Sequence, residues 1–156
     1  METSTATDKL SAFKDFPPLD ILLLILFSLI TFGIYTWWWM YSRSIILNGV
    51  LPEGQCINTN FMHLCLGGFV VTLLLAITAG FQLDNISLQN TVNILSLALN
   101  ILVVVWVLHF RRGVHFLLGQ DKTAYHMNLF WTLLFQVFYM QHKLNLIRAH
   151  SQIGIM

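Results

Sequence analysis

The sequence predicts an all-α protein, a polytopic membrane protein built as a four-span transmembrane helical bundle. Two observations support this fold class. Of the 156 residues, 56% are hydrophobic and only 10% are charged, whereas roughly a quarter of a soluble protein is charged. The chain also contains four apolar runs, each long enough to cross a hydrocarbon core of ~30 Å as a helix. Lipid is therefore the expected solvent for most of the chain, and the length suits one domain.

The spans are expected at about residues 19–41, 61–81, 90–110 and 126–147, within a transmembrane domain covering 17–148. A polar tail, residues 1–16, precedes this domain, and a short tail, residues 149–156, follows it. No secretory signal peptide is expected, because the first apolar run is too long and lacks a small-residue cleavage site. Pro17 and Pro18 break the chain before the first span.

The first apolar run ends in three consecutive tryptophans. Successive helical residues point about 100° apart, so no single packing face needs all three rings. Indole suits the lipid interface, since it is apolar with one N–H to satisfy. Arginines near the span ends belong to the same set, which either anchors the helices at the interface or seats a lipid phosphate. The residues of this set are Trp37, Trp38, Trp39, Arg43, Arg111 and Arg112.

Two kinds of side chain mark the expected helix-packing faces. The second run carries a small residue at every fourth position, which lets two helix backbones approach closely. The third run carries polar residues three and four apart, which share one face that should point into the bundle. The small residues could instead form a self-association face, and the polar ones could line a polar pathway. The packing set is Gly68, Thr72, Ala76, Gly80, Asn93, Ser96, Asn100 and Gln136.

Residues at both ends of the chain resemble a known family signature. Near the first span these are Thr31, Phe32, Gly33, Ile34, Tyr35, Trp39, Arg43 and Asn48, and near the C-terminus Tyr139, Gln141 and Asn145. The pattern is similar to that of a widespread family of small bacterial membrane proteins, the domain of unknown function 4234. The tryptophan triplet is richer in aromatic rings than the usual family pattern. The resemblance implies a helical bundle in a bacterial inner membrane and supplies no activity, cofactor or catalytic residue.

Histidines at the span ends are the weak candidates for a haem or metal site. His63, His109 and His126 lie on one side of the expected bundle, and facing helices can supply paired imidazoles to haem. Histidine is also at home at a membrane interface, and no CxxCH motif is present. We therefore expect no cofactor.

An enzymatic role is not expected either. No Asp, Glu, Lys or Arg lies in the interior of an expected span, because Asp20 and Lys143 fall near span ends. The charges that mark pumps and transporters in mid-membrane are therefore not expected. The sequence also contains no catalytic triad order, no HExxH and no phosphate loop. The short loops carry no paired carboxylates at a spacing suited to acid–base catalysis.

Charge bears on partners and on orientation. The net charge of +1 comes without a basic stripe, so nucleic acid is not an expected partner. Four spans divide the Lys and Arg residues equally between the two sides, which leaves the positive-inside rule undecided. One side would carry Lys9, Lys14, Lys143 and Arg148, and the other Arg43, Arg111, Arg112 and Lys122.

The function expected from these features is association within the membrane. The chain would act as a homo-oligomer or as an accessory subunit or scaffold of a larger complex, with membrane lipids and a protein partner. One alternative is a pore or membrane-perturbing effector, in which several copies place Asn93, Ser96, Asn100 and Gln136 around an aqueous path. A lower alternative is a haem- or metal-binding membrane protein.

Overall fold

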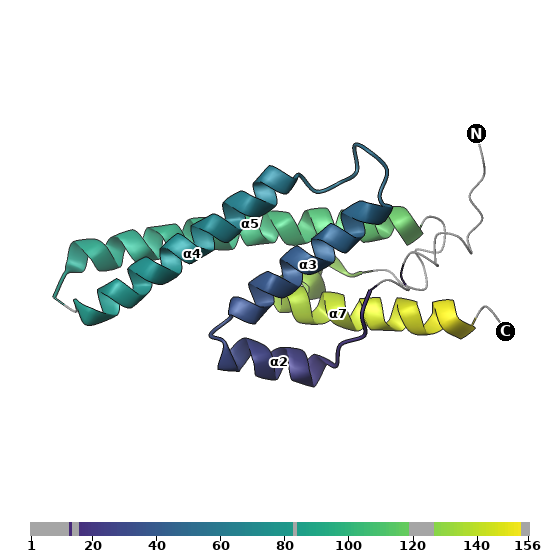
Figure 1. Cartoon of the computed structure of the whole chain (residues 1–156), viewed down its shortest axis with the longest axis horizontal. Helices are drawn as coiled ribbons and strands as arrows, with labels where there is room; N and C mark the ends of the chain where they lie inside the picture. The colour runs from purple at the N-terminus through teal and green to yellow at the C-terminus, as the bar shows by residue number, and fades with distance from the viewer. Residues whose placement is uncertain (1–12, 14–15, 83, 119–126, 154–156) are drawn as a thin grey trace. The chain divides into compact units, whose positions relative to one another are not determined.

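The computed structural model describes residues 13, 16–82, 84–118 and 127–153, the last four of these without their side chains. Over these residues the chain forms five α-helices and no strand, which confirms the all-α prediction (Figure 1). The chain divides into two compact units, Met1–Ile57 with Val107–Met156, and Asn58–Trp106. The helices are α2 (Ile21–Ile30), α3 (Ile34–Val50), α4 (Thr59–Phe81), α5 (Ile86–Leu118) and α7 (Leu129–Ile153).

The first expected span is two helices that fold back on each other, so the prediction of one helix over 19–41 is wrong. The Asp20 side chain caps α2 by accepting a hydrogen bond from the Leu22 N–H. The helix then stops, because Phe32 and Gly33 have φ values of +50° and +87°, which an α-helix cannot contain. The Thr36 hydroxyl lies 2.9 Å from the Ser28 hydroxyl, although eight residues of straight helix would separate them by about 12 Å.

The fourth expected span, 126–147, is also interrupted. Residue 126 lies outside the described residues, and α7 contains a non-helical residue, Gln136, with φ +38° and ψ −113°. The Asn128 N–H donates to the Tyr139 hydroxyl at 3.1 Å, which a straight helix between these positions would not allow. The chain therefore reverses at Gln136, and residues 129–135 form a second helical hairpin with the rest of α7.

The second and third expected spans lie within α4 and α5, which form a hairpin. Both helices are long and apolar enough to cross a membrane, with a mean hydropathy of 2.3 in their most apolar windows. Only 17% of each window is buried, unlike the core helix of a soluble protein, which would be mostly buried. By this measure the two helices suggest membrane association.

Helix α5 runs past the expected end of the third span. We expected Arg111, Arg112 and Gly113 to end that span, but the helix continues to Leu118. Gly113 allows close packing within the unit that contains it, because a Cβ there would lie 2.9 Å from Leu51 Cδ1 and 3.0 Å from Leu47 Cδ2. This glycine therefore marks a helix contact instead of a helix end.

The small-residue stripe of α4 is only partly used for packing. A Cβ at Gly68 would lie 2.9 Å from Leu99 Cδ2 of α5, and Thr72 is buried. Ala76 and Gly80 are exposed, so the prediction that they pack against another helix is wrong within this unit. Positions four apart drift about 40° per step around a straight helix. The buried line instead repeats every seven residues, through Cys65, Thr72 and Ala79.

Replacing Gly33 with alanine should destabilise the α2–α3 hairpin. A Cβ at Gly33 meets no atom within 4 Å, so the cost comes from holding an L-residue at φ +87°, about 1–2 kcal/mol. We expect a lower midpoint in thermal unfolding followed by circular dichroism in detergent.

Gly49→Ala is the matched control for this substitution. Gly49 lies within α3, has a φ outside the left-handed region and also has open space around its Cα. Alanine there should stabilise the helix by about 0.5–1 kcal/mol. Equal effects of the two substitutions would contradict the assignment of Gly33 as the residue that reverses the chain.

Candidate functional site

A chain of buried hydrogen bonds joins the two hairpins of the unit formed by 1–57 and 107–156. The Trp39 indole N–H of α3 donates to Gln141 Oε1 of α7 at 2.8 Å. The Gln141 amide donates to Asn145 Oδ1 at 2.7 Å, and the Asn145 amide donates to the Leu19 carbonyl at 2.8 Å. Trp39 and Gln141 are 0% and 1% exposed. Every donor in this chain meets an acceptor, as buried polar groups require.

Arg43 extends this network on the α3 side. Its guanidinium lies 5.8 Å from the centre of the Trp39 ring and donates to the Pro17 carbonyl at 3.1 Å. The side chain is 5% exposed, and its Nε has no hydrogen-bond partner among the described residues. Burial lowers the pKa of Arg43, and the nearby Tyr35 opposes this shift. The cation is therefore held by a backbone carbonyl and an aromatic face.

Other polar side chains fasten the segments that enter and leave the hairpins. The Asn48 amide donates to the Ile57 carbonyl and accepts from the Ile57 N–H, both at 2.8 Å. On α5, Arg111 Nε donates to the Met127 carbonyl at 2.8 Å, and His115 Nε2 accepts from the Met127 N–H at 3.2 Å. These contacts satisfy backbone groups where no helix can do so.

Four of the residues that resemble a family signature, Trp39, Arg43, Gln141 and Asn145, therefore form one contact system. A family model described as "Domain of unknown function (DUF4234)" matches residues 19–116. The chain belongs to the DUF4234 family. Gln141 and Asn145 lie outside the matched residues, yet they complete the hydrogen bonds of Trp39. No match was found among curated proteins or solved structures.

Within this DUF4234 protein, the signature residues act as clamps on the two hairpins. The Thr31 hydroxyl donates to the Phe27 carbonyl and accepts from the Tyr35 N–H at the first reversal. The Tyr139 hydroxyl accepts from the Asn128 N–H at the start of α7. Asn48, Arg43 and Asn145 bind the backbone of neighbouring segments, as described above. Sequence reasoning placed these residues in the signature without finding their pairing.

The expected interfacial set does not lie in one kind of environment. The three tryptophans point in different directions, with Trp38 57% exposed, Trp37 half-buried and Trp39 fully buried. The prediction that Trp39 and Arg43 are interfacial anchors is wrong, because their polar groups are engaged inside the unit. Arg111 is half-buried on the Met127 carbonyl, and Arg112 is exposed.

The expected polar packing face of α5 is turned away from the protein. Asn93 and Asn100 are exposed, and Ser96 is half-buried. The prediction that this face points into a bundle is therefore wrong for a single chain. The sequence shows that these residues share a face, whereas the side of α5 that meets α4 is set by Leu99 against Gly68. Gln136 lies at the break in α7 and is half-buried.

No metal-binding arrangement is found among the residues that the structure describes. In that part of the chain, no group of three or more His, Cys, Asp or Glu could hold a metal ion. Of the weak candidates, His63 and His109 are exposed, and His126 lies outside the described residues.

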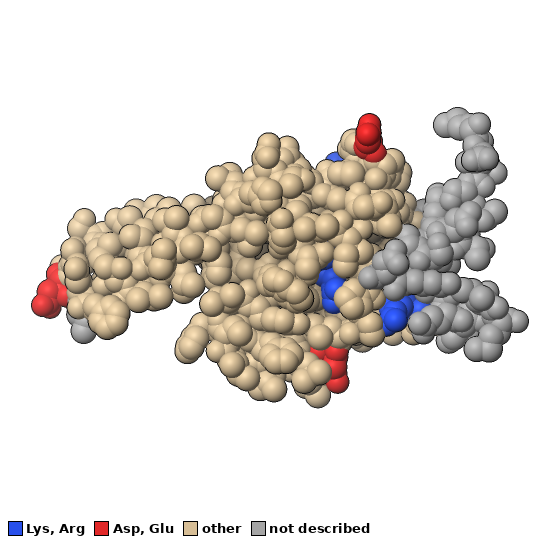
Figure 2. Space-filling view, viewed as in Figure 1, with Lys and Arg blue, Asp and Glu red and all other residues tan. Residues whose placement is uncertain are grey.

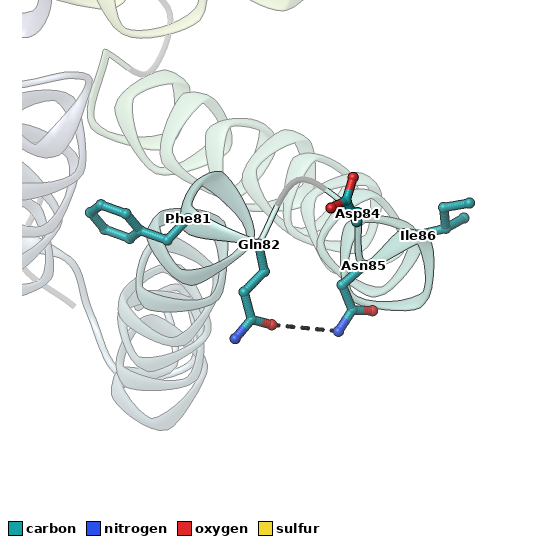
Figure 3. Close-up of a pocket in the computed structure, with 5 residues that line it drawn as sticks. All are labelled: Phe81, Gln82, Asp84, Asn85 and Ile86. Atoms are coloured by element: carbon teal, nitrogen blue, oxygen red, sulfur yellow. Dashed lines mark hydrogen bonds between the residues drawn. The ribbon is translucent and has the colours of Figure 1, made fainter.

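An open depression of about 530 Å³ lies at the connection between α4 and α5. It is lined by Phe81, Gln82, Asp84, Asn85 and Ile86. Figure 3 shows the Asn85 amide donating to Gln82 Oε1, at 3.5 Å, while the Asp84 carboxylate points away from this pair. A single carboxylate gives this depression no acid–base pair.

The buried network also lacks groups that could transfer a proton. Indole and carboxamide groups do not ionise near neutral pH, and an arginine stays protonated in proteins. The arrangement can hold two chain reversals in place, which is a structural role. It provides neither a nucleophile nor a general base.

Replacing Gln141 with methionine should leave the Trp39 N–H and the Asn145 Oδ1 buried without partners. Each unsatisfied group costs about 1–3 kcal/mol, so we expect a lower free energy of unfolding in detergent. Trp39→Phe removes the same donor. The double variant should therefore lose less stability than the sum of the single variants.

Gln82→Met is the control, because the Gln82 side chain is exposed and accepts only the long hydrogen bond from the Asn85 amide. It should change stability by less than about 0.5 kcal/mol. Strict additivity of the Trp39 and Gln141 substitutions would show that the two residues do not act together.

Proposed function

We propose that this protein is an integral component of a membrane that functions by association, with α4 and α5 as its complete spans. The observation that carries the proposal is the exposed surface of these two helices. It is apolar through most of their length, and it also carries exposed amides, including Asn93 and Asn100 of α5. Figure 2 shows that the end of this hairpin near its connection is tan apart from the acidic connection itself, and residues 59–81 and 86–110 contain no Asp, Glu, Lys or Arg. Such a surface suits lipid, whereas amides exposed in lipid favour a protein partner.

The hairpins α2–α3 and α7 are proposed to be re-entrant, which means that they enter the bilayer and return to the same side. The ten residues of α2 rise about 15 Å, half of a hydrocarbon core. Apolar side chains around this helix are exposed, up to 89% at Phe32 in the turn. Residues 129–135 are similarly apolar and exposed, including Phe130 and Leu134. Such large exposed apolar patches are unfavourable in water and favourable in lipid.

This topology supplies an orientation that four spans left undecided. Two spans and two re-entrant hairpins place both termini and the 51–58 connection on one side of the membrane. The connection between α4 and α5 lies alone on the other side, and its sequence, 82–85, contains none of the eight Lys and Arg residues. The positive-inside rule then favours cytoplasmic termini and an external α4–α5 connection.

Association is proposed in preference to catalysis because of the chemistry of the polar groups. The buried polar side chains of the unit of 1–57 and 107–156 are the Trp39 indole, the Gln141 amide, the Arg43 guanidinium and three hydroxyls, those of Ser28, Ser44 and Thr132. None of these groups is a general base near neutral pH. The polar groups on α5 include exposed amides, which can bind another helix and cannot act as general acids or bases. The finer role of the chain, as a homo-oligomer or as a subunit of a larger complex, depends on the partner.

Cysteine labelling from each side of the membrane tests the topology. In a background with Cys56→Ser and Cys65→Ala, we expect a membrane-impermeant maleimide to label Asp84→Cys in right-side-out vesicles. Glu53→Cys and Ala149→Cys should react only in inverted vesicles. Four complete spans would instead place Asp84 and Ala149 on the same side, with Glu53 opposite.

Phe32→Cys at the hairpin turn serves as the control for re-entry. It should resist the impermeant reagent from both sides and react with a lipid-soluble maleimide. Rapid labelling of this position in either kind of vesicle, at the rate of Glu53→Cys, would show that the hairpin lies in water. An assembly role also requires that the protein, extracted from its native membrane in mild detergent with whatever it binds, has a mass above that of one chain.

A further inference from the structure

Helix α5 carries an exposed seam with the spacing of a two-helix contact. Its members recur three and four residues apart, which is the repeat of a left-handed helix pair. Amide and apolar side chains share this seam, and all but the half-buried Val104 are exposed. The seam consists of Ile86, Asn90, Asn93, Leu97, Asn100 and Val104.

The seam lies on the side of α5 away from α4. Leu99 faces α4, where it meets Gly68. At 100° per residue, Leu97 lies about 160° around the helix from Leu99, and Asn93 lies about 120° from it. The α4–α5 contact therefore leaves these side chains uncovered.

The amides of the seam have unused hydrogen-bonding capacity. The Asn100 amide donates to the Ser96 carbonyl of its own helix at 2.8 Å, which leaves one N–H and the carbonyl oxygen available. The Asn93 side chain makes no hydrogen bond with any described residue. In the middle of a bilayer neither lipid nor water would satisfy these groups.

We propose that this seam binds the same seam of a second copy of the chain, forming a parallel α5–α5 pair. The inference rests on the proposed membrane function, because exposed amides demand a protein partner only in lipid. A carboxamide carries both donors and an acceptor, so an identical carboxamide is a complete partner for it.

Membrane insertion makes the pairing specific. Every copy inserts with the same orientation, so two α5 helices related by a two-fold axis along the membrane normal run parallel. Each seam residue then faces its own counterpart at the same depth, Asn93 against Asn93 and Asn100 against Asn100. No Asp, Glu, Lys or Arg lies among residues 86–110, so identical seams do not repel each other.

Disulfide cross-linking in the native membrane tests the proposal. In the background lacking Cys56 and Cys65, Leu97→Cys should give a disulfide-linked dimer on mild oxidation. Ala98→Cys is the matched control, because this position is exposed at nearly the same depth but lies about 100° around the helix. It should remain monomeric under the same oxidation.

Substitution of the amides gives a second, independent measurement. In nanodiscs, Asn93→Leu and Asn100→Leu should each weaken dimerisation about three- to tenfold, since each removes one interhelical amide pair. Asn60→Leu, at an exposed amide near the start of α4, should leave the dimer unchanged. The leucine variants keep an apolar span, so their insertion serves as the check on folding.

The outcomes separate this inference from the proposed function. If the Leu97→Cys variant stays monomeric, or if the Leu97→Cys and Ala98→Cys variants cross-link equally, a second copy of the chain is not the partner of the seam. Protection of position 97 by a different protein, without a dimer, would overturn the inference as well. If the Asp84→Cys, Glu53→Cys and Ala149→Cys variants are labelled as expected in the same membranes, the proposed topology still holds. Labelling that contradicted the topology would instead remove the basis of both proposals.

Discussion

The hydrogen-bond chain from Trp39 through Gln141 and Asn145 to Leu19 is the interaction on which the 1–57 and 107–156 unit depends. Each hairpin contains a reversal that a continuous helix would avoid, and each reversal leaves backbone groups to be satisfied. The chain of amides links α3, α7 and the entry to α2 in one buried path. Arg43 and Asn48 then bind the backbone on either side of it.

The two units handle polar groups in opposite ways. The first unit buries its amides and pairs them with one another, which fixes the geometry of its own helices. The hairpin of α4 and α5 turns its amides outward and packs through Gly68, Thr72 and Leu99. Under the proposed topology, the first unit is internally satisfied, whereas the second has polar capacity for a partner. Under the proposed function, side-chain amides thus stabilise one unit and bind a partner in the other.

The sequence predicted the helical fold class, the family and the two long apolar helices, because these depend on composition, on run length and on signature residues. It did not reveal the interruptions. Phe32 and Gly33 lie within an apolar run of span length, and Gln136 is a good helix former, so the hydrophobic pattern predicts no break at either place. Only the low helix propensity of Gly33 favours one. Backbone conformation at these positions depends on contacts made elsewhere in the unit.

Side-chain direction was the second limit. Periodicity shows which residues share a face of α5, but the covered face is decided by the helix that packs on it. Trp38 and Trp39 are adjacent residues of the same type, yet Trp39 is buried and Trp38 is exposed. Contacts with residues distant in the chain distinguish them, since Trp39 meets Gln141 and the ring of Phe110. Likewise, the sequence alone suggests that Arg111 is an anchoring arginine, whereas in the structure it binds the Met127 carbonyl.

The separation of Trp39 and Gln141 by 102 positions sets an order on biosynthesis. When the apolar stretch around α2 and α3 leaves the ribosome, its closing partner has not yet been made. The N-terminal segment therefore leaves the ribosome before its reversal can form those hydrogen bonds. The N-terminal hairpin can complete them only after α4 and α5 have been synthesised and Gln141 and Asn145 have emerged. A chain that stops before these residues leaves the Trp39 indole without its acceptor.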